Sequence, residues 1–229
     1  NSDGWLVYDT EKEFRRQGVK WGLESINNDI SKNEIIKNEN SISSNSNFSL
    51  KFRTCWINEK FEFCSSYPES FLVPISISDE DLIETAGFRT KSRIPVLCYY
   101  NKENMASIWR SSQTRSGLTY QRNEKDEKLL QAIWEVNSSL KKNEKLIIYD
   151  ARPYLNALAN RFKGAGFENT DNYKMAEICF CEIDNIHSVR NASTKLTSII
   201  TNPKLMENKN FFSNLESSTW LSFIYQILK

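Results

Sequence analysis

The sequence holds little of what metal centres and common catalytic triads are built from. Its 229 residues include one histidine, and its five cysteines are an odd number at irregular spacings without a CxxC pair. A single histidine argues against a histidine-rich metal site and a histidine-based triad. The cysteine spacing argues against both a disulfide framework and a zinc site. We therefore expect no metal, no cofactor, and reduced thiols that mostly pack.

Long apolar runs and a charge excess are also missing. No run approaches the roughly 20 residues that cross a bilayer, and the amino terminus has no basic-then-apolar signal segment. Lys and Arg number 30 against 29 Asp and Glu, so the net charge is +1. This balance gives no support for nucleic-acid binding, although a local basic patch stays compatible with it. The composition predicts a cytoplasmic globular chain of one large domain or two small ones, with no transmembrane segment.

Glycine is scarce, with 7 residues. No glycine loop is followed by Lys-Ser or Lys-Thr, and Gly164 with Gly166 would end a helix where a phosphate-binding loop begins one. The sequence thus argues against nucleotide binding.

Residues 25–49 lack the means to form a core. Fourteen of these 25 residues are Asn or Ser, and Phe48 is their only aromatic residue. Such a composition cannot bury enough apolar surface to offset the entropy of ordering. We expect a mobile surface insertion.

The most informative stretch covers residues 145–190. The apolar run 146–149 predicts a strand, and Pro153 suits the first turn of a helix after it. A second apolar run at 176–183 shows no alternation, which is typical of a strand covered on both faces. The helix between them carries its apolar residues on one face, and it ends at Gly164 and Gly166. The apolar residues are Leu155, Leu158, Ala159 and Phe162. The pattern predicts a βαβ crossover, a unit that usually places ligands at the carboxyl ends of its strands.

Polar side chains follow this crossover. Asn185 comes just after the second strand, and Asn160 and Lys163 end the helix before it. Two amides and an ammonium can donate hydrogen bonds to an oxyanion. The alternative is that Asn160 caps the helix and Lys163 is solvated.

The other elements have simpler signals. Apolar and aromatic runs bounded by Ser or Pro predict strands at 52–63, 71–77, 94–100 and 107–110. Helices are predicted to begin at the caps Ser78 and Asn123, and to cover about 190–200 and 215–229 with a loop around Pro203. The aromatic residues near the amino terminus, including Phe14 and Trp21, are interpreted as buried anchors.

Several strings resemble the middle of the myotubularin family: DARP at 150–153, NALANRFKGAGFE at 156–168 and DNIHSVR at 184–190. Further similar strings lie in the family's order at 3–19, 66–82, 88–97, 123–133 and 214–221, and Arg110, Ser112 and Gln113 match an Arg-x-Ser-Gln motif. The resemblance covers nearly the whole chain except the insertion. Members of this family are phosphoinositide 3-phosphatases of the Cys-dependent protein-tyrosine-phosphatase superfamily.

The resemblance implies an α/β fold with a mixed central sheet flanked by helices, similar to protein tyrosine phosphatases and incomplete at the carboxyl terminus. Residues 1–229 would be the amino-terminal part of the phosphatase domain, with 25–49 inserted in it.

The family's catalytic loop has a Cys with an Arg six positions later. No cysteine here has an Arg at that distance. In the family the loop follows the segment similar to 214–221 by a few tens of residues, so we expect it beyond Lys229. The chain alone is then predicted to be inactive.

The resemblance also implies site residues. Asn160, Asn185 and Ile186 match family residues that line the inositol phosphate pocket, and Lys163 could meet a second phosphate. Asp150 and His187 are interpreted as structural, and Arg152 as the partner of a carboxylate or a helix end.

The implied function is hydrolysis of the 3-phosphate of phosphatidylinositol 3-phosphate or 3,5-bisphosphate through a cysteinyl-phosphate intermediate. The partner would be a phosphoinositide headgroup at a membrane surface, reached from the cytoplasm at endosomes, and homo- or hetero-oligomers with relatives fit the family. One alternative is an inactive pseudophosphatase that acts as an adaptor for an active relative. Another is a product that only binds or packs.

Overall fold

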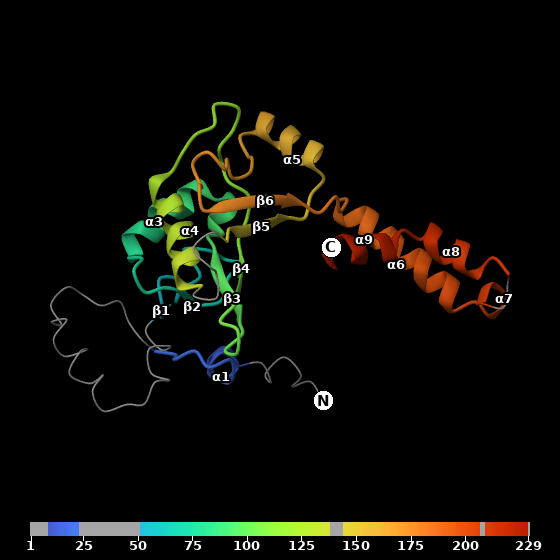
Figure 1. The fold of residues 1–229 in the computed structure, drawn as a ribbon, viewed down its shortest axis with the longest axis horizontal. Coiled ribbons are helices and arrows are strands. Elements are labelled where there is room, and N and C mark those ends of the chain that lie inside the picture. Colours follow the sequence, from blue (N-terminus) through green and yellow to red (C-terminus); the bar gives the residue numbers. More distant parts are fainter. Residues whose placement is uncertain (1–8, 23–50, 138–143, 207–208, 229) are drawn as a thin grey trace.

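The computed structural model describes residues 9–22, 51–137, 144–206 and 209–228. The predicted insertion 25–49 and the aromatic residues before Asp9 lie outside this part of the chain. The described residues form two regions (Figure 1). We call residues 9–180 the body and residues 186–228 the arm.

The body begins with α1 (Thr10–Arg16), whose first turn is capped by the Asp9 carboxylate. Phe14 on this helix is buried and its ring stacks on Trp21 at 5.9 Å between centroids. The predicted burial is confirmed for Phe14, whereas Trp21 is only partly buried against the same cluster.

The first sheet pairs β1 (Phe52–Cys55) with β2 (Phe71–Pro74) in antiparallel fashion. All eight of its residues are buried. The predicted strand 52–63 was too long, because Asn58 organises a turn after β1. Its buried amide nitrogen donates to the carbonyls of Cys64, Tyr67 and Pro68 at 2.8–3.2 Å.

Two capped helices cover this sheet. In α3 (Asp79–Phe88) the Ser78 hydroxyl accepts from the Asp81 amide, and in α4 (Glu124–Val136) the Asn123 side chain accepts from the Asp126 amide. Both predicted caps are confirmed. The two helices pack together over a core that includes Leu82, Leu129 and Ile133. A short 3-10 turn, η3 (Thr90–Ser92), follows α3.

The second sheet is the predicted hairpin of β3 (Val96–Tyr100) and β4 (Ser107–Arg110). The third sheet pairs β5 (Leu146–Asp150) in parallel with β6 (Ala176–Phe180). Between them run α5 (Tyr154–Asn160) and η4 (Arg161–Lys163), which Gly164 ends in a left-handed conformation. The βαβ crossover and its glycine stop are confirmed.

Two details of this region differ from the sequence prediction. The exposure of β6 alternates along the strand, so β6 is not covered on both faces. The described strands also form three two-stranded sheets, whereas a mixed central sheet was predicted. The facing edges of β4 and β5 form no ladder with one another, and this break separates the second sheet from the third.

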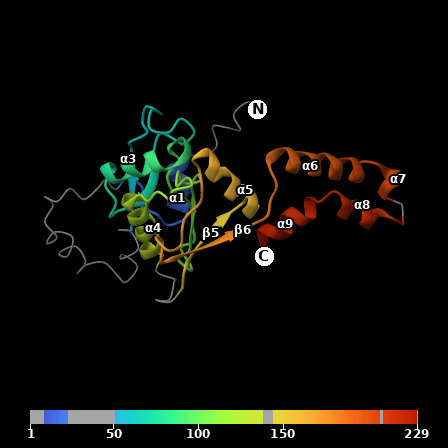
Figure 2. The ribbon, with the colours of Figure 1, turned by 90° about the horizontal axis from the view of Figure 1, so that it is seen from above.

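The arm consists of helices that extend away from the body (Figures 1 and 2). These are α6 (Ile186–Ile200), α7 (Pro203–Met206), α8 (Phe211–Ser217) and α9 (Trp220–Leu228). Helix α6 begins four residues before the predicted start near 190, because Asn185 caps it. The predicted loop around Pro203 holds α7, and the predicted helix 215–229 is broken at Thr219, whose φ is 63°.

No helix in the described part of the chain is long and apolar enough to cross a membrane.

Candidate functional site

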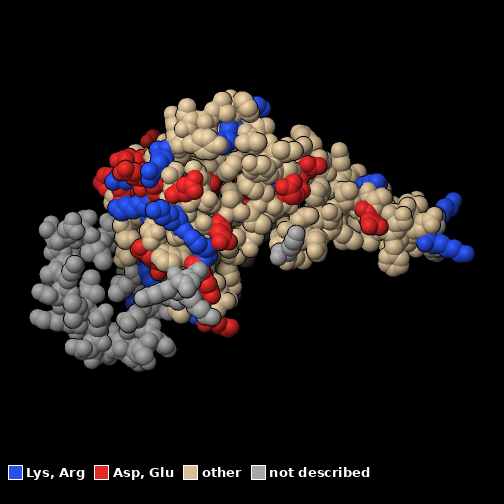
Figure 3. Space-filling model, turned by 45° about the horizontal axis from the view of Figure 1, so that its top comes forward, with Lys and Arg blue, Asp and Glu red and all other residues tan. Residues whose placement is uncertain are grey.

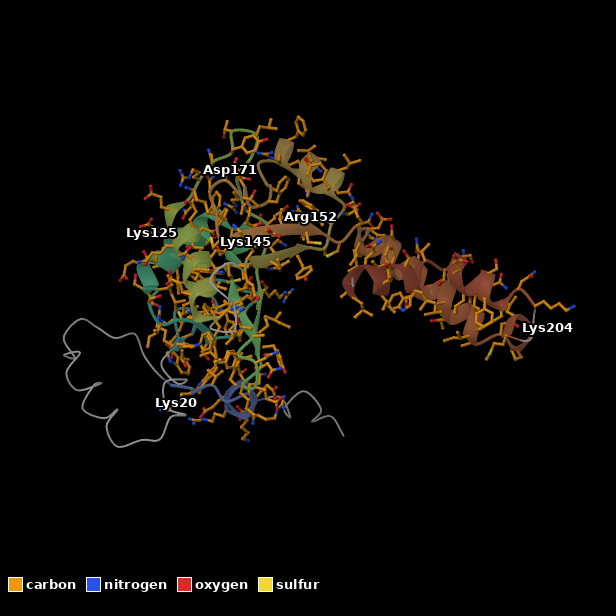
Figure 4. All side chains as sticks on the ribbon, in the orientation of Figure 1. Lys20, Lys125, Lys145, Arg152, Asp171 and Lys204 are labelled. Atoms are coloured by element: carbon orange, nitrogen blue, oxygen red, sulfur yellow. The ribbon has the colours of Figure 1, made fainter. Side chains whose placement is uncertain are left out.

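An open pocket of about 430 Å³ lies at the carboxyl end of β5. Figure 4 shows Arg152, one of its residues, beside the ends of β5 and β6. Three further segments reach the pocket, namely η3, the turn after β4, and the end of α5. Its lining is Thr90, Lys91, Arg93, Ser111, Ser112, Gln113, Ile148, Tyr149, Asp150, Ala151, Arg152, Asn160 and Glu168.

Arg152 is held in place on all sides. Its Nε donates to Asp150 Oδ1 at 2.9 Å, and its Nη2 donates to Asp150 Oδ2 at 2.5 Å and to the Gly166 carbonyl at 3.0 Å. Its Nη1 donates to Gln113 Oε1. The predicted pairing of Arg152 with a carboxylate is thus confirmed. Because Asp150 neutralises this guanidinium and its donors are used, Arg152 orders the pocket instead of offering a free charge.

The contact between Arg152 and Gln113 determines which atoms the side-chain amides of Gln113 and Asn160 present to the pocket. A guanidinium only donates, so Gln113 must turn its oxygen to Arg152, and its Nε2 remains as a donor. Asn160 Nδ2 lies 3.5 Å from the same Gln113 oxygen, which is a weak contact. In this orientation Asn160 presents its Oδ1 as an acceptor. The pair therefore offers one donor and one acceptor, a combination that suits hydroxyls as well as phosphate oxygens.

Lys91 and Arg93 supply the pocket's uncompensated charge. Arg93 Nε donates to the Ser66 hydroxyl at 2.8 Å, and neither cation has an ion-pair partner among the residues that the structure describes. Lys91 and Ser92 both adopt left-handed backbone angles, with φ of 57° and 55°. The arrangement gives one side of the pocket a positive potential that favours an anion.

A buried ion network forms the floor below. Arg89 donates to both oxygens of Asp126 at 2.6 Å, to Glu168 at 2.5 Å and to the Ser112 carbonyl at 2.9 Å. Tyr173 adds a hydrogen bond to Asp126 at 2.7 Å. Burial alone would lower the pKa of the Arg89 guanidinium, but the two carboxylates outweigh it and raise that pKa. The network ties α3, α4 and the segments flanking the pocket into one rigid base.

The predicted site residues are only partly brought together. Asn160 lines the pocket, whereas Lys163, Asn185 and Ile186 are exposed and are not part of its lining. The Asn185 oxygen accepts from the backbone amides of His187 and Ser188, so its side chain serves as the cap of α6. Its amide nitrogen is not used by this cap.

Sequence reasoning did not find Lys91, Arg93 or a pocket role for Gln113. The signals were there in the basic string FRTKSRIPVL at 88–97 and in the Arg-x-Ser-Gln motif. The sequence does not show that these segments, which lie about 40 to 60 residues before α5 in the chain, fold against the end of α5.

No cysteine is among the residues that line the pocket. All five are free thiols. Burial raises the pKa of Cys55 to about 11, and burial also raises the pKa of Cys98 and Cys181. A nucleophilic cysteine needs the opposite shift, toward a thiolate near neutral pH. The described residues also hold no cluster of His, Cys, Asp and Glu that could bind a metal ion.

A second hollow of about 360 Å³ adjoins the pocket. We call it the β4–β5 groove because β4 and β5 form its walls, with Leu130 and Ile133 of α4 also lining it. The groove and the pocket share Ser111, Ile148, Tyr149 and Glu168, so the two are continuous.

Comparison with known proteins gives a consistent result. A family model described as the myotubularin-like phosphatase domain matches residues 1–229. A myotubularin from Xenopus laevis is 39% identical over 226 residues, which are 99% of this chain and 32% of that protein. The Bos taurus protein named phosphatidylinositol-3,5-bisphosphate 3-phosphatase MTMR2 is 39% identical over 220 residues, which are 96% of this chain and 28% of that protein. The chain therefore spans about a third of the length of these curated relatives.

Proposed function

Because the chain belongs to the family of myotubularin-like phosphatase domains, we propose that it is the amino-terminal part of a phosphatase domain acting on phosphoinositides. The proposed substrates are phosphatidylinositol 3-phosphate and 3,5-bisphosphate, and the reaction removes the 3-phosphate. The proposed setting is the cytoplasmic side of endosomal membranes, where the protein would bind peripherally. The names of the MTMR2 relatives support the bisphosphate as substrate and the 3-position as the site of attack.

The proposed chemistry uses a cysteine thiolate from outside this chain. The thiolate attacks phosphorus, the bond from phosphorus to the inositol oxygen breaks, and the leaving oxygen takes a proton. Water then attacks the phosphocysteine, releasing inorganic phosphate and restoring the thiolate. This assignment is supported by the raised pKa values of Cys55, Cys98 and Cys181 and by the lack of an Arg six positions after any of the five cysteines.

One observation carries the proposal: the β4–β5 groove opens into a pocket that holds two amides and two cations without an ion-pair partner among the described residues. Each wall of the groove is a strand edge that pairs with no other strand in the part of the chain that the structure describes. We propose that a strand from outside these 229 residues lies here parallel to β5 and joins the second and third sheets into one mixed sheet. It would end beside the pocket and deliver a loop to it, where parallel strands usually place catalytic loops. This arrangement would give the fold of a protein tyrosine phosphatase.

The pocket's own residues would then hold the headgroup. Asn160 and Gln113 would bind inositol hydroxyls or phosphate oxygens, and Lys91 and Arg93 would face phosphate charge. Asn185 and Ile186 follow β6, whose carboxyl end lies beside that of β5, and Lys163 lies three residues after Asn160. We place these three at the outer side of the same site.

The test is phosphate release by the full-length protein from vesicles that contain either lipid. Release is expected, and Asn160→Ala should lower kcat/KM about 3- to 10-fold, the effect of one lost hydrogen bond. Asn156→Ala is the matched control, because Asn156 is exposed one turn earlier on α5 and does not line the pocket. Equal effects of the two variants would show that Asn160 does not contribute to the substrate site.

The same assay separates the alternatives. A folded full-length protein that releases no phosphate but binds an active relative would be an adaptor, and the enzymatic proposal would fail. The 229-residue chain alone should release none. Measurable release from it would show that the nucleophile lies within the chain.

A further inference from the structure

Four large apolar side chains stand exposed on adjoining segments at one side of the pocket. Leu155 and Phe162 project from α5 and η4 with 73% and 75% of their surface exposed. Leu118 and Tyr120, in the loop before α4, are exposed by 56% and 55%. Single exposed apolar residues are common, but a group on neighbouring segments indicates an interaction site. We call these four residues the α5 surface.

The two segments are held together by direct contacts. Arg161 Nε donates to the Gly117 carbonyl at 3.1 Å, and the guanidinium lies 3.4 Å from the centre of the Tyr120 ring. The Gly117 amide donates to the Ala165 carbonyl, also at 3.1 Å. Figure 1 shows helix α5 at the top of the body, together with the loop that precedes α4. The four apolar side chains therefore belong to one supported surface.

The two segments that carry this surface hold only basic charge, while the Glu182 carboxylate contacts the Tyr154 amide next to Leu155 at 3.1 Å. Neither residues 114–123 nor residues 151–167 contain an acidic residue. Arg115 and Lys163 are exposed and have no ion-pair partner in the described part of the chain. Figure 3, which brings the top of the molecule forward, shows a mostly uncharged area over α5 with isolated basic side chains. Apolar side chains with basic neighbours complement the interface of an anionic bilayer.

The position of the surface matches that partner. Asn160 lines the pocket and precedes Arg161 on the same helix, while Gln113 lines the pocket and precedes the loop of Leu118. The α5 surface thus flanks the pocket from two segments. A headgroup in the pocket stays attached to acyl chains in a bilayer, so whatever lies beside the mouth of the pocket meets the membrane.

We propose that the α5 surface inserts its apolar side chains into the interface of an anionic lipid bilayer and holds the pocket against it. The inference rests on the proposed function for its choice of partner, since that function requires a lipid headgroup in the pocket. The binding itself needs no phosphoinositide. Insertion draws on apolar burial, and Arg115 and Lys163 add attraction to anionic lipid.

The experiment is sedimentation of the 229-residue chain with vesicles of phosphatidylcholine and phosphatidylserine that contain no phosphoinositide. The test variant is Leu155→Ser with Phe162→Ser. The control variant is Phe212→Ser with Leu228→Ser, two side chains of the same types that are about 80% exposed on the arm. The test pair should weaken vesicle binding at least tenfold, because each buried apolar side chain contributes about tenfold or more. The control pair should change it less than twofold.

Three results would overturn the proposal. The wild-type chain could fail to bind the vesicles, the two pairs could weaken binding equally, or sedimentation velocity could show a dimer that the test pair alone dissociates. The last result would assign the surface to a second copy of the chain. Lys163→Glu adds a charge test, since it should weaken binding to vesicles with phosphatidylserine and not to pure phosphatidylcholine.

This outcome is separable from that of the proposed function. If only the membrane inference is wrong, the full-length protein with the test pair still hydrolyses vesicle lipids at the wild-type rate. If only the proposed function is wrong, vesicle binding persists while no phosphate is released.

Discussion

The body and the arm differ in how they use apolar residues. The body buries a large apolar core among its own elements, with Leu72, Leu82 and Leu129 fully inaccessible, although it leaves side chains of the α5 surface exposed. The arm buries Ala192 and Ile199, while Phe212 and Leu228 remain about 80% exposed. Both regions contain well-formed helices. The contrast shows that secondary structure here follows local sequence, whereas a core requires partners that only the body has among the described residues.

The largest expected effect on stability comes from removing the buried cation, Arg89. Arg89→Met would leave Asp126 and Glu168 without their counter-charge in the interior, and we expect a loss of about 3–5 kcal/mol in unfolding free energy. Urea unfolding measures the loss, and hydrogen exchange should locate it in the body, with arm helices protected as before. Arg122→Met is the control, because Arg122 pairs with Glu127 at the surface, and its loss should stay below about 1 kcal/mol. Similar losses in both variants would show that the network does not support the body.

Truncation of one leucine in each region tests the contrast directly. Leu129→Ala removes a fully buried side chain between α3 and α4, and it should cost about 2–5 kcal/mol through lost burial and the cavity left behind. Leu228→Ala in α9 should change the unfolding free energy by no more than about 0.5 kcal/mol. Chemical denaturation of both variants is the measurement. A large effect at Leu228 would mean that α9 is buried in solution.

Matched caps sharpen the comparison further. Asn123 caps α4 in the body and Asn185 caps α6 in the arm, each through its side-chain oxygen. Replacement by Ala should cost about 1 kcal/mol at either site. We expect the loss at Asn123 to lower global stability, while the loss at Asn185 should increase hydrogen exchange only in the first turn of α6. Asn191→Ala, inside α6 and exposed, should not destabilise the helix. Global destabilisation by Asn185→Ala would show that arm and body unfold as one cooperative unit.

The smallest expected effect is on the loss of thermal stability at low pH. Asp81 in α3 contacts Lys125 and Lys128 of α4 at 2.7 and 2.6 Å. Burial would raise the pKa of Asp81, but the hydrogen bonds from the two lysines outweigh it, so the pKa lies below the ordinary value of 3.8. A lowered pKa stabilises the fold above pH 3.8, and this contribution is lost as the pH falls below it. Melting temperatures between pH 6 and pH 3 should fall less steeply in Asp81→Asn than in wild type. Parallel curves would contradict the assignment.

Local signals in the sequence predicted much of the body. Caps such as Ser78 and Asn123 need only a side chain and an amide three residues away, and the glycine stop after α5 needs only a left-handed backbone. The parallel crossover followed from two apolar runs of strand length. These features depend on a few neighbouring residues, which is why pattern reading found them.

The failures involve contacts between distant residues. The turn that ends β1 depends on Asn58 reaching carbonyls up to ten residues away. The pocket combines Lys91, Gln113 and Asn160, which no spacing rule connects. Asn185 shows the reverse case, since a residue predicted as a ligand also makes a local cap. Whether it contacts a headgroup as well stays a prediction.

The open edges of β4 and β5 affect how the protein is made. Each edge presents backbone N–H and C=O groups that can pair with any extended peptide, including one from a neighbouring nascent chain. Ribosomes add about 5–20 residues per second, so both edges emerge and stay uncovered while later residues are still being translated. Among the described residues no strand lies between these edges, so pairing with another extended chain would cover them.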